Sequence, residues 1–149
     1  MKKTKKVLLV LLILTVAFIW VHSAMDPETS ANESGWVKKI VEPFLELFVG
    51  KGNVTEHLVR KLAHFSEFAL LGFELLAYIS LCRGSSSFSN AAYSCNFALI
   101  TAVIDETVQI FSGRGSSLKD VWLDFAGAFF GSVIAVAVVR IAGKHFSSD

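Results

Sequence analysis

Charged residues, prolines and cysteines are scarce in this chain. Only 18% of its 149 residues are Asp, Glu, Lys or Arg, and it has 2 prolines and 2 cysteines. Apolar residues make up 53% of the chain, which is above the roughly 45 to 50% of ordinary soluble domains. The composition argues against a soluble globular protein and predicts a single small membrane domain over residues 1–149.

These scarcities also argue against several functions. The net charge is only +1 and the basic residues form no patch, so a nucleic-acid partner is not predicted. Cys82 and Cys95 are too few for a disulfide scaffold, and they fall at the end of two apolar segments expected in the reducing cytoplasm. His64 and the carboxylates could bind a divalent cation, but no close His pair or Cys cluster is present. The metal signal is therefore weak, and we predict neither a metal site nor a cofactor.

Long apolar runs are what the chain does have. They predict four transmembrane helices, over residues 7–23, 58–82, 91–111 and 118–142. Residues 1–6 carry four lysines and precede the first run. By the positive-inside rule that end is cytoplasmic, and an even number of spans places both termini there.

A cleaved signal peptide begins in a similar way, and it remains the alternative for the first run. Cleavage after Ser23 or Ala24 would then remove that run. The run is longer than a usual signal-peptide core, which favours a retained helix. Either way, the segment that follows is expected outside.

Residues 34–49 form a separate amphipathic helix by their periodicity, after a polar linker over residues 25–32. Its apolar half-circle comprises Trp36, Val37, Ile40, Val41, Phe44, Leu45, Leu47 and Phe48. The opposite half carries lysines and glutamates. This pattern is typical of a helix that lies in the outer membrane interface, or of a lid packed on the other helices. The expected fold is therefore an all-α membrane protein with four transmembrane helices and one interfacial helix on the outer side.

Ionisable side chains occur inside the predicted spans, close to their outer ends. Arg60, His64 and Glu67 share one stripe of the second span, whereas Asp105 and Gln109 share a stripe of the third. A charge at the centre of a membrane helix costs about 3 kcal/mol, so such groups normally face a bundle interior and serve a function. Asp120 and Asp124 lie on one face of the fourth span and continue into a Gly127-x-x-x-Gly131 strip that allows close helix approach.

A glycine-rich turn joins the third and fourth spans. Gly113, Arg114 and Gly115 lead directly into a helix N-terminus, where free amide groups and a guanidinium favour an anion. Purely structural roles are equally open: Asp120 fits a capping box with Ser117, and Arg114 can serve only to neutralise Asp105, Glu106 or Asp120.

Two motifs carry a family resemblance. They are Arg60-Lys61-x-x-His64-Phe65-x-Glu67-Phe68 and the series that runs from Asp105-Glu106-x-x-Gln109 through Gly113-Arg114-Gly115 to Asp120, Asp124 and Gly127. Together they resemble the VanZ-like family, small integral membrane proteins named for a teicoplanin-resistance protein. The chain departs from the usual family pattern at Ser112, where Pro is common, and at Asp124, where Asn is common.

The resemblance implies a multi-pass protein of the bacterial cell envelope, associated in some members with tolerance of lipoglycopeptide antibiotics. It brings no settled catalytic residues. We therefore expect an outward-facing polar pocket that binds or processes an anionic ligand, either lipid-linked or related to the cell wall, among membrane lipids. The candidate ligand-binding residues are Arg60, Glu106, Gln109, Arg114, Gly115, Ser116, Asp120 and Asp124.

The sequence does not decide whether a reaction occurs in this pocket. If it does, His64, Glu67 and Asp105 are the candidate catalytic residues of a hydrolase or transferase acting on a phosphate-bearing headgroup. A small proton-coupled carrier is the third alternative. It is less favoured because ionisable groups thin out beyond Glu74 toward the cytoplasmic end.

Overall fold

The computed structural model describes residues 2–84, 88–115 and 117–145, and these form helices joined by short turns. The helices are α1 (Lys2–Ser23), α2 (Pro27–Val49), α3 (Glu56–Arg83), α4 (Phe88–Phe111) and α5 (Leu118–His145). The described residues contain no strand, as the all-α prediction required.

Local hydrogen bonds explain several helix ends. Thr55 caps α3, because its side chain accepts a hydrogen bond from the amide of Leu58 at 3.1 Å. Gly50 ends α2 with a φ of 85°, a backbone conformation that favours glycine. Ser117 and Asp120 form the expected cap of α5: the Asp120 amide donates to Ser117 Oγ, which in turn donates to the Asp120 carboxylate. The sequence prediction that Ser117 and Asp120 interact at the start of α5 is confirmed.

The start of α2 differs from the prediction. Residues 25–32 were expected to be a linker, yet the helix begins at Pro27, seven residues before position 34. Asp26 caps it by accepting hydrogen bonds from the amides of Glu28 and Thr29 at 3.1 and 3.0 Å. The Thr29 amide also lowers the pKa of the Asp26 carboxyl. Proline is favoured in the first turn of a helix, so this polar stretch had a helix-start signal that its composition concealed.

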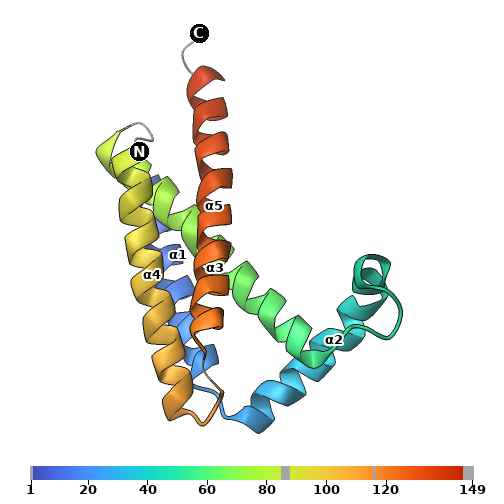
Figure 1. The fold of residues 1–149 in the computed structure, drawn as a ribbon. Helices are drawn as coiled ribbons and strands as arrows, with labels where there is room; N and C mark the ends of the chain where they lie inside the picture. Colours follow the sequence, from blue (N-terminus) through green and yellow to red (C-terminus); the bar gives the residue numbers. More distant parts are fainter. Residues whose placement is uncertain (1, 85–87, 116, 146–149) are drawn as a thin grey trace.

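Four of the helices form an elongated bundle, and α2 projects from it (Figure 1). Helix α4 contacts α1, α3 and α5, whereas α2 packs on α3. The chain reverses direction between successive bundle helices, so both ends of the chain lie at one end of the bundle. The α1–α2 connection and the α4–α5 turn meet at the opposite end (Figure 1).

The crossing of α3 and α5 is the most extensive helix contact, and it depends on glycine. A Cβ atom at Gly131 would lie 1.7 Å from the carbonyl oxygen of Ala69, and one at Gly72 would lie 1.9 Å from that of Ala128. Gly127 is similarly close to Phe65. Backbones at this distance leave no room for a side chain, which confirms the small-residue strip predicted for α5.

Three helices are long and apolar enough to cross a membrane: α1, α3 and the Leu118–Ile141 part of α5. In the described part of the chain, α4 does not meet this criterion, although it has 24 residues. Its buried face carries Asn90, Asp105, Glu106 and Gln109, which lower its hydropathy. The structure therefore supports a multi-pass membrane protein, and three of the four predicted spans qualify.

Candidate functional site

One histidine and two aspartates from three helices meet inside the bundle. His64 of α3 places its Nδ1 atom 3.7 Å from Oδ2 of Asp105 in α4 and 4.0 Å from Oδ1 of Asp124 in α5. The relative exposures are 8%, 0% and 1%, respectively. The α3–α5 crossing at Gly127 adjoins this cluster in sequence and holds His64 and Asp124 on facing helices.

Asp105 is held by hydrogen bonds on both of its oxygens. Ser23, the last residue of α1, donates its hydroxyl to Oδ1, and Gln109 donates Nε2 to Oδ2 at 2.8 Å. Asp105 and Gln109, which the sequence places on one stripe of the helix, are thus joined by a hydrogen bond within α4. The carboxylate is fixed in one orientation beside His64.

A polar cavity of about 280 Å³ opens from this cluster. It is lined by His57, Arg60, Lys61, His64, Glu106, Gln109, Arg114, Gly115, Asp120, Leu123 and Asp124. Seven of the eight residues expected to bind a ligand lie on its wall, and the eighth, Ser116, lies outside the described residues. The structure brings these side chains together, and their roles stay predictions.

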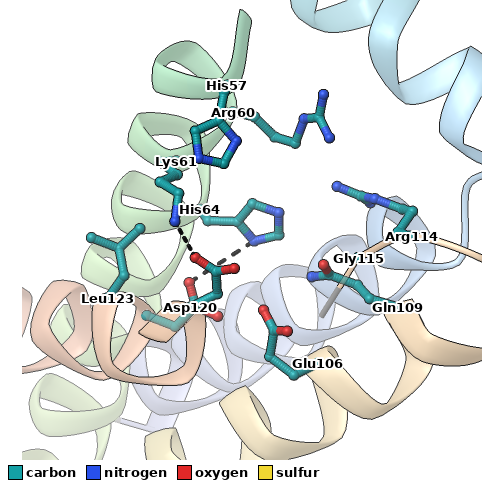
Figure 2. A pocket seen from close by; sticks show the side chains of 11 residues that line it. His57, Arg60, Lys61, His64, Glu106, Gln109, Arg114, Gly115, Asp120 and Leu123 are labelled. Atoms are coloured by element: carbon teal, nitrogen blue, oxygen red, sulfur yellow. Dashed lines mark hydrogen bonds and ion pairs between the residues drawn. The ribbon is translucent and has the colours of Figure 1, made fainter. Parts of the chain in front are cut away.

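The cationic side of the cavity is formed by Arg60 and Arg114. Figure 2 shows their guanidinium groups converging on one side of the cavity, with Glu106 and Asp120 on the other. Both Nε atoms are buried and have no hydrogen-bond partner among the described residues. Burial, followed by the nearby Arg60 charge, lowers the pKa of Arg114.

The pairing expected for Arg114 is not formed with either aspartate. Its Nη1 atom donates to the carbonyl oxygen of His22 at 3.0 Å, and the described residues show no ion pair from it to Asp105 or Asp120. Asp120 instead pairs with Lys61 of α3. The reason is the position of α1, whose end reaches the turn and offers Arg114 a backbone acceptor.

The backbone of the turn is largely occupied by the protein itself. The amides of Gly113 and Arg114 donate to carbonyl oxygens at the end of α4, and the amide of Ser117 donates to Glu106 Oε2 at 3.0 Å. The anion cup expected from these amides is therefore not open at those three positions. The guanidinium groups of Arg60 and Arg114 remain as cationic groups on the cavity wall.

Glu67, one of the two acid–base partners considered for His64, does not line the polar cavity. Its Oε1 atom lies 3.1 Å from Nδ1 of His22, and it lines a second cavity between α1, α2 and α3. His64 and Glu67 share a stripe of α3, but the first faces α4 and α5 while the second faces α1. The spacing on one helix could not distinguish these two neighbours.

His22 and Ser23 are the site residues that the sequence analysis missed. The His22 ring stacks on that of His64, with the centroids 5.9 Å apart and the planes 16° apart. His22 also lies 3.5 Å from Glu33 of α2. In the sequence they are visible only as two polar residues at the end of an apolar run. Their partners, Glu67 and Asp105, become clear only when α1 packs against α3 and α4.

The fold and the site define a class: a helical, multi-pass membrane protein with a buried ionisable cluster and a polar cavity at one end of its bundle. The chain belongs to the VanZ/LLP1 family, because the family model matches residues 8–140. This confirms the resemblance inferred from the two motifs. No curated protein and no solved structure matches the chain.

Proposed function

We propose that this VanZ-like envelope protein binds an anionic, lipid-linked or cell-wall-related ligand in the polar cavity, which faces the outside of the cell. In this proposal α1, α3, α4 and α5 all span the membrane. Helix α4 buries its polar face against the bundle and shows lipid its exposed apolar residues, among them Ile100, Val103 and Ile110.

The observation that carries the proposal is a pair of buried Nε atoms without hydrogen-bond partners in the described part of the chain, one on each of two cavity-lining arginines. Arg60 and Arg114 converge on one cavity, and the buried Nε atom of each has no hydrogen-bond partner among the described residues. Two adjacent positive charges repel each other, and a buried donor without an acceptor costs about 1 to 3 kcal/mol. A phosphate or carboxylate bound between them would satisfy both groups.

A second cavity supports a ligand that carries an acyl or prenyl chain. It measures about 560 Å³, lies between α1, α2 and α3, and shares Arg60 with the polar cavity. Phe18, Trp36 and Val59 contribute apolar side chains to its wall. An amphiphile could therefore place its headgroup beside Arg60 and its chain in this second cavity.

Helix α2 fits an interfacial position in this proposal. Val41 and Leu45 line a groove against α3, whereas Trp36, Leu47 and Phe48 are exposed by 67%, 78% and 73%. The apolar face thus contacts α3 with one edge and leaves the other edge for lipid. In this proposal α2 acts both as the lid and as the anchor that the sequence left as alternatives.

Native mass spectrometry of the detergent-purified protein tests the proposal. Phosphatidylglycerol should bind in preference to phosphatidylcholine. Arg114→Gln should weaken phosphatidylglycerol binding by about tenfold, because it removes one charge-assisted hydrogen bond worth about 1.4 kcal/mol. Lys119→Gln is the matched control, because Lys119 is exposed and lies outside the cavity. Equal losses in the two variants would show general charge attraction and reject the pocket.

A membrane-embedded hydrolase or transferase is the second candidate. His64 lines the cavity with the two arginines, and its Nδ1 atom lies 3.7 Å from Oδ2 of Asp105 behind it, which favours this candidate. Closing that gap to hydrogen-bond distance when substrate binds would allow proton transfer next to a bound phosphate. His64→Gln separates the two candidates. An enzyme should lose turnover of a phosphate-bearing lipid while keeping its fold, whereas a binding protein should retain the lipid.

A further inference from the structure

We propose that His64, Asp105 and Asp124 bind one divalent cation at the floor of the polar cavity. The spacing of residues in the sequence indicates no metal site, because the three donors come from three different helices. The cation is expected to bind without any lipid, so this inference goes beyond the proposed function and can be tested separately from it.

The geometry suits a metal ion. One donor atom from each residue can be chosen so that all three lie within 4.8 Å of one another. The two distances from His64 Nδ1 are 3.7 and 4.0 Å. An ion with bonds of about 2.0 to 2.2 Å to nitrogen and oxygen holds its ligand atoms about 3 to 4 Å apart. Only small side-chain movements would bring the three atoms onto one centre.

Burial without partners is the second, independent observation. Asp124 is 1% exposed, and neither of its carboxylate oxygens has a hydrogen-bond partner among the described residues. The Nδ1 atom of His64, which faces both aspartates, has none either. A buried carboxylate without hydrogen bonds or a counter-ion is costly, and a coordinated metal ion supplies what is missing.

The lack of basic partners for the two aspartates also supports a bound cation. In the part of the chain that the structure describes, Asp105 and Asp124 form no ion pair with Lys or Arg. Lys61 is committed to Asp120, and Arg114 to the carbonyl oxygen of His22. A divalent cation would neutralise the two aspartates while His64 coordinates in its neutral form.

Asp105 also has the surroundings of a metal ligand. Its carboxylate accepts hydrogen bonds from Ser23 and Gln109, which fix its orientation and leave lone pairs directed elsewhere. Carboxylate ligands in metal sites are held by hydrogen bonds of this kind. His64 and Asp124 line the cavity, which provides an entry path and room for water or a ligand oxygen at the remaining coordination positions.

The donor set selects the kind of ion. One imidazole with two carboxylates suits Zn²⁺ or Mn²⁺ better than Ca²⁺, which takes six to eight oxygen ligands. An ion here would lie on the acidic side of the cavity, facing Arg60 and Arg114. If the proposed function holds, the ion would coordinate an oxygen of the bound anion from the side opposite the arginines.

The test uses Mn²⁺ with the full-length protein, washed with chelator and studied in detergent without added lipid. We expect one Mn²⁺ bound per chain and competition by Zn²⁺. Asp124→Asn should weaken Mn²⁺ binding by at least about tenfold. Removing a residue that only hydrogen-bonds to a metal ligand already costs about 10- to 100-fold in affinity, and Asp124 is proposed as a ligand itself. Asp120→Asn is the matched control, because Asp120 lies one turn away in the same cavity and pairs with Lys61.

Pulsed electron paramagnetic resonance on the wild-type protein provides a measurement that requires no variant to fold. Bound Mn²⁺ should show coupling to an imidazole nitrogen, and His64→Gln should remove it. The absence of this coupling in the wild type would overturn the proposal. So would equal weakening by Asp124→Asn and Asp120→Asn, which would show only general attraction to negative charge.

Absence of Mn²⁺ and Zn²⁺ binding would also overturn the proposal, and infrared spectra would then identify the alternative. A protonated carboxyl band that is lost in Asp124→Asn would show that a proton occupies the place assigned to the metal. Lipid binding that still depends on Arg114 would, in that case, leave the proposed function intact.

Discussion

Asp105 of α4 receives hydrogen bonds from Ser23 of α1 and from Gln109 one turn further along α4. This connects the buried cluster to the first helix, which the sequence analysis treated only as an anchor or a cleavable signal. Ser112 in the turn strengthens the link by donating its hydroxyl to the carbonyl oxygen of Ser23 at 3.0 Å. The end of α1 is therefore part of the site at the level of single residues.

Ser23→Ala should destabilise the protein by about 1 to 3 kcal/mol, because it removes a hydrogen bond from a buried carboxylate. The measurement is thermal or denaturant unfolding in detergent. Ser66→Ala is the control: Ser66 is exposed and bonds only to the carbonyl oxygen of Leu62 in its own helix, so its loss should change stability by less than about 0.5 kcal/mol. Equal stability of both variants and the wild type would contradict the role given to Ser23.

The sequence could identify ionisable residues inside apolar segments, because such residues are costly there. It could not assign their partners. Glu67 and Asp105 were alternative partners for His64; Asp105 lies 3.7 Å from it, whereas Glu67 contacts His22. Position on a helix face follows from spacing, whereas the identity of the facing helix depends on tertiary packing.

At the scale of helices, the most extensive contact between the described helices is the crossing of α3 and α5. Gly72 of α3 meets Ala128, while Gly127 and Gly131 of α5 meet Phe65 and Ala69. Ser132 adds a hydrogen bond to the carbonyl oxygen of Gly72 at 3.1 Å. Lipid supplies no hydrophobic force between helices, so close backbone packing and such polar contacts hold them together.

Gly131→Ala should separate these helices and destabilise the protein by about 1 to 3 kcal/mol, because the new methyl group would overlap the backbone of Ala69. Gly35→Ala is the matched substitution inside another helix. There the nearest atom to the added Cβ is a side-chain oxygen of Glu56 at 3.6 Å, so alanine should be neutral or stabilise α2 by up to about 1 kcal/mol. The unfolding midpoints of the two variants should move in opposite directions or differ clearly. Identical shifts would show that the crossing tolerates a side chain.

The helices themselves were largely predictable, because apolar runs and caps are local signals. The five predicted segments correspond to α1 through α5. The early start of α2 was missed because residues 25–32 are polar, and polarity alone does not separate a linker from an exposed helical turn capped by Asp26. The direction of α2 relative to the bundle depends on contacts with α3 that no local pattern specifies.

At the scale of the whole molecule, polar residues line a cavity inside the bundle, and large apolar residues cover much of its outer surface. The cavity, the ionisable cluster and the α4–α5 turn lie at the end opposite the two termini (Figure 1). Large apolar residues such as Phe18, Ile100 and Ile134 are exposed on three different helices. This distribution is typical of a multi-pass membrane protein.

The topology is the property of the whole chain that the proposed function most requires, and cysteine labelling tests it. Four basic residues precede the apolar part of α1, so the termini should be cytoplasmic and the site outside. In a background with Cys82 and Cys95 replaced by Ser, a membrane-impermeant maleimide should label Glu28→Cys and Lys119→Cys on intact cells. Both positions are exposed, and they lie in the first turns of α2 and α5, which follow the α1–α2 connection and the α4–α5 turn.

Lys2→Cys, an exposed position at the opposite end, is the control and should react only after the cells are permeabilised. The reverse pattern would place the cavity inside the cell and remove extracellular ligands from consideration. Failure of Lys2→Cys to react in either condition, together with a mature mass that begins near Met25, would show that α1 is cleaved. His22 and Ser23 would then be lost from the site, and Arg114 and Asp105 would lose the partners that α1 provides.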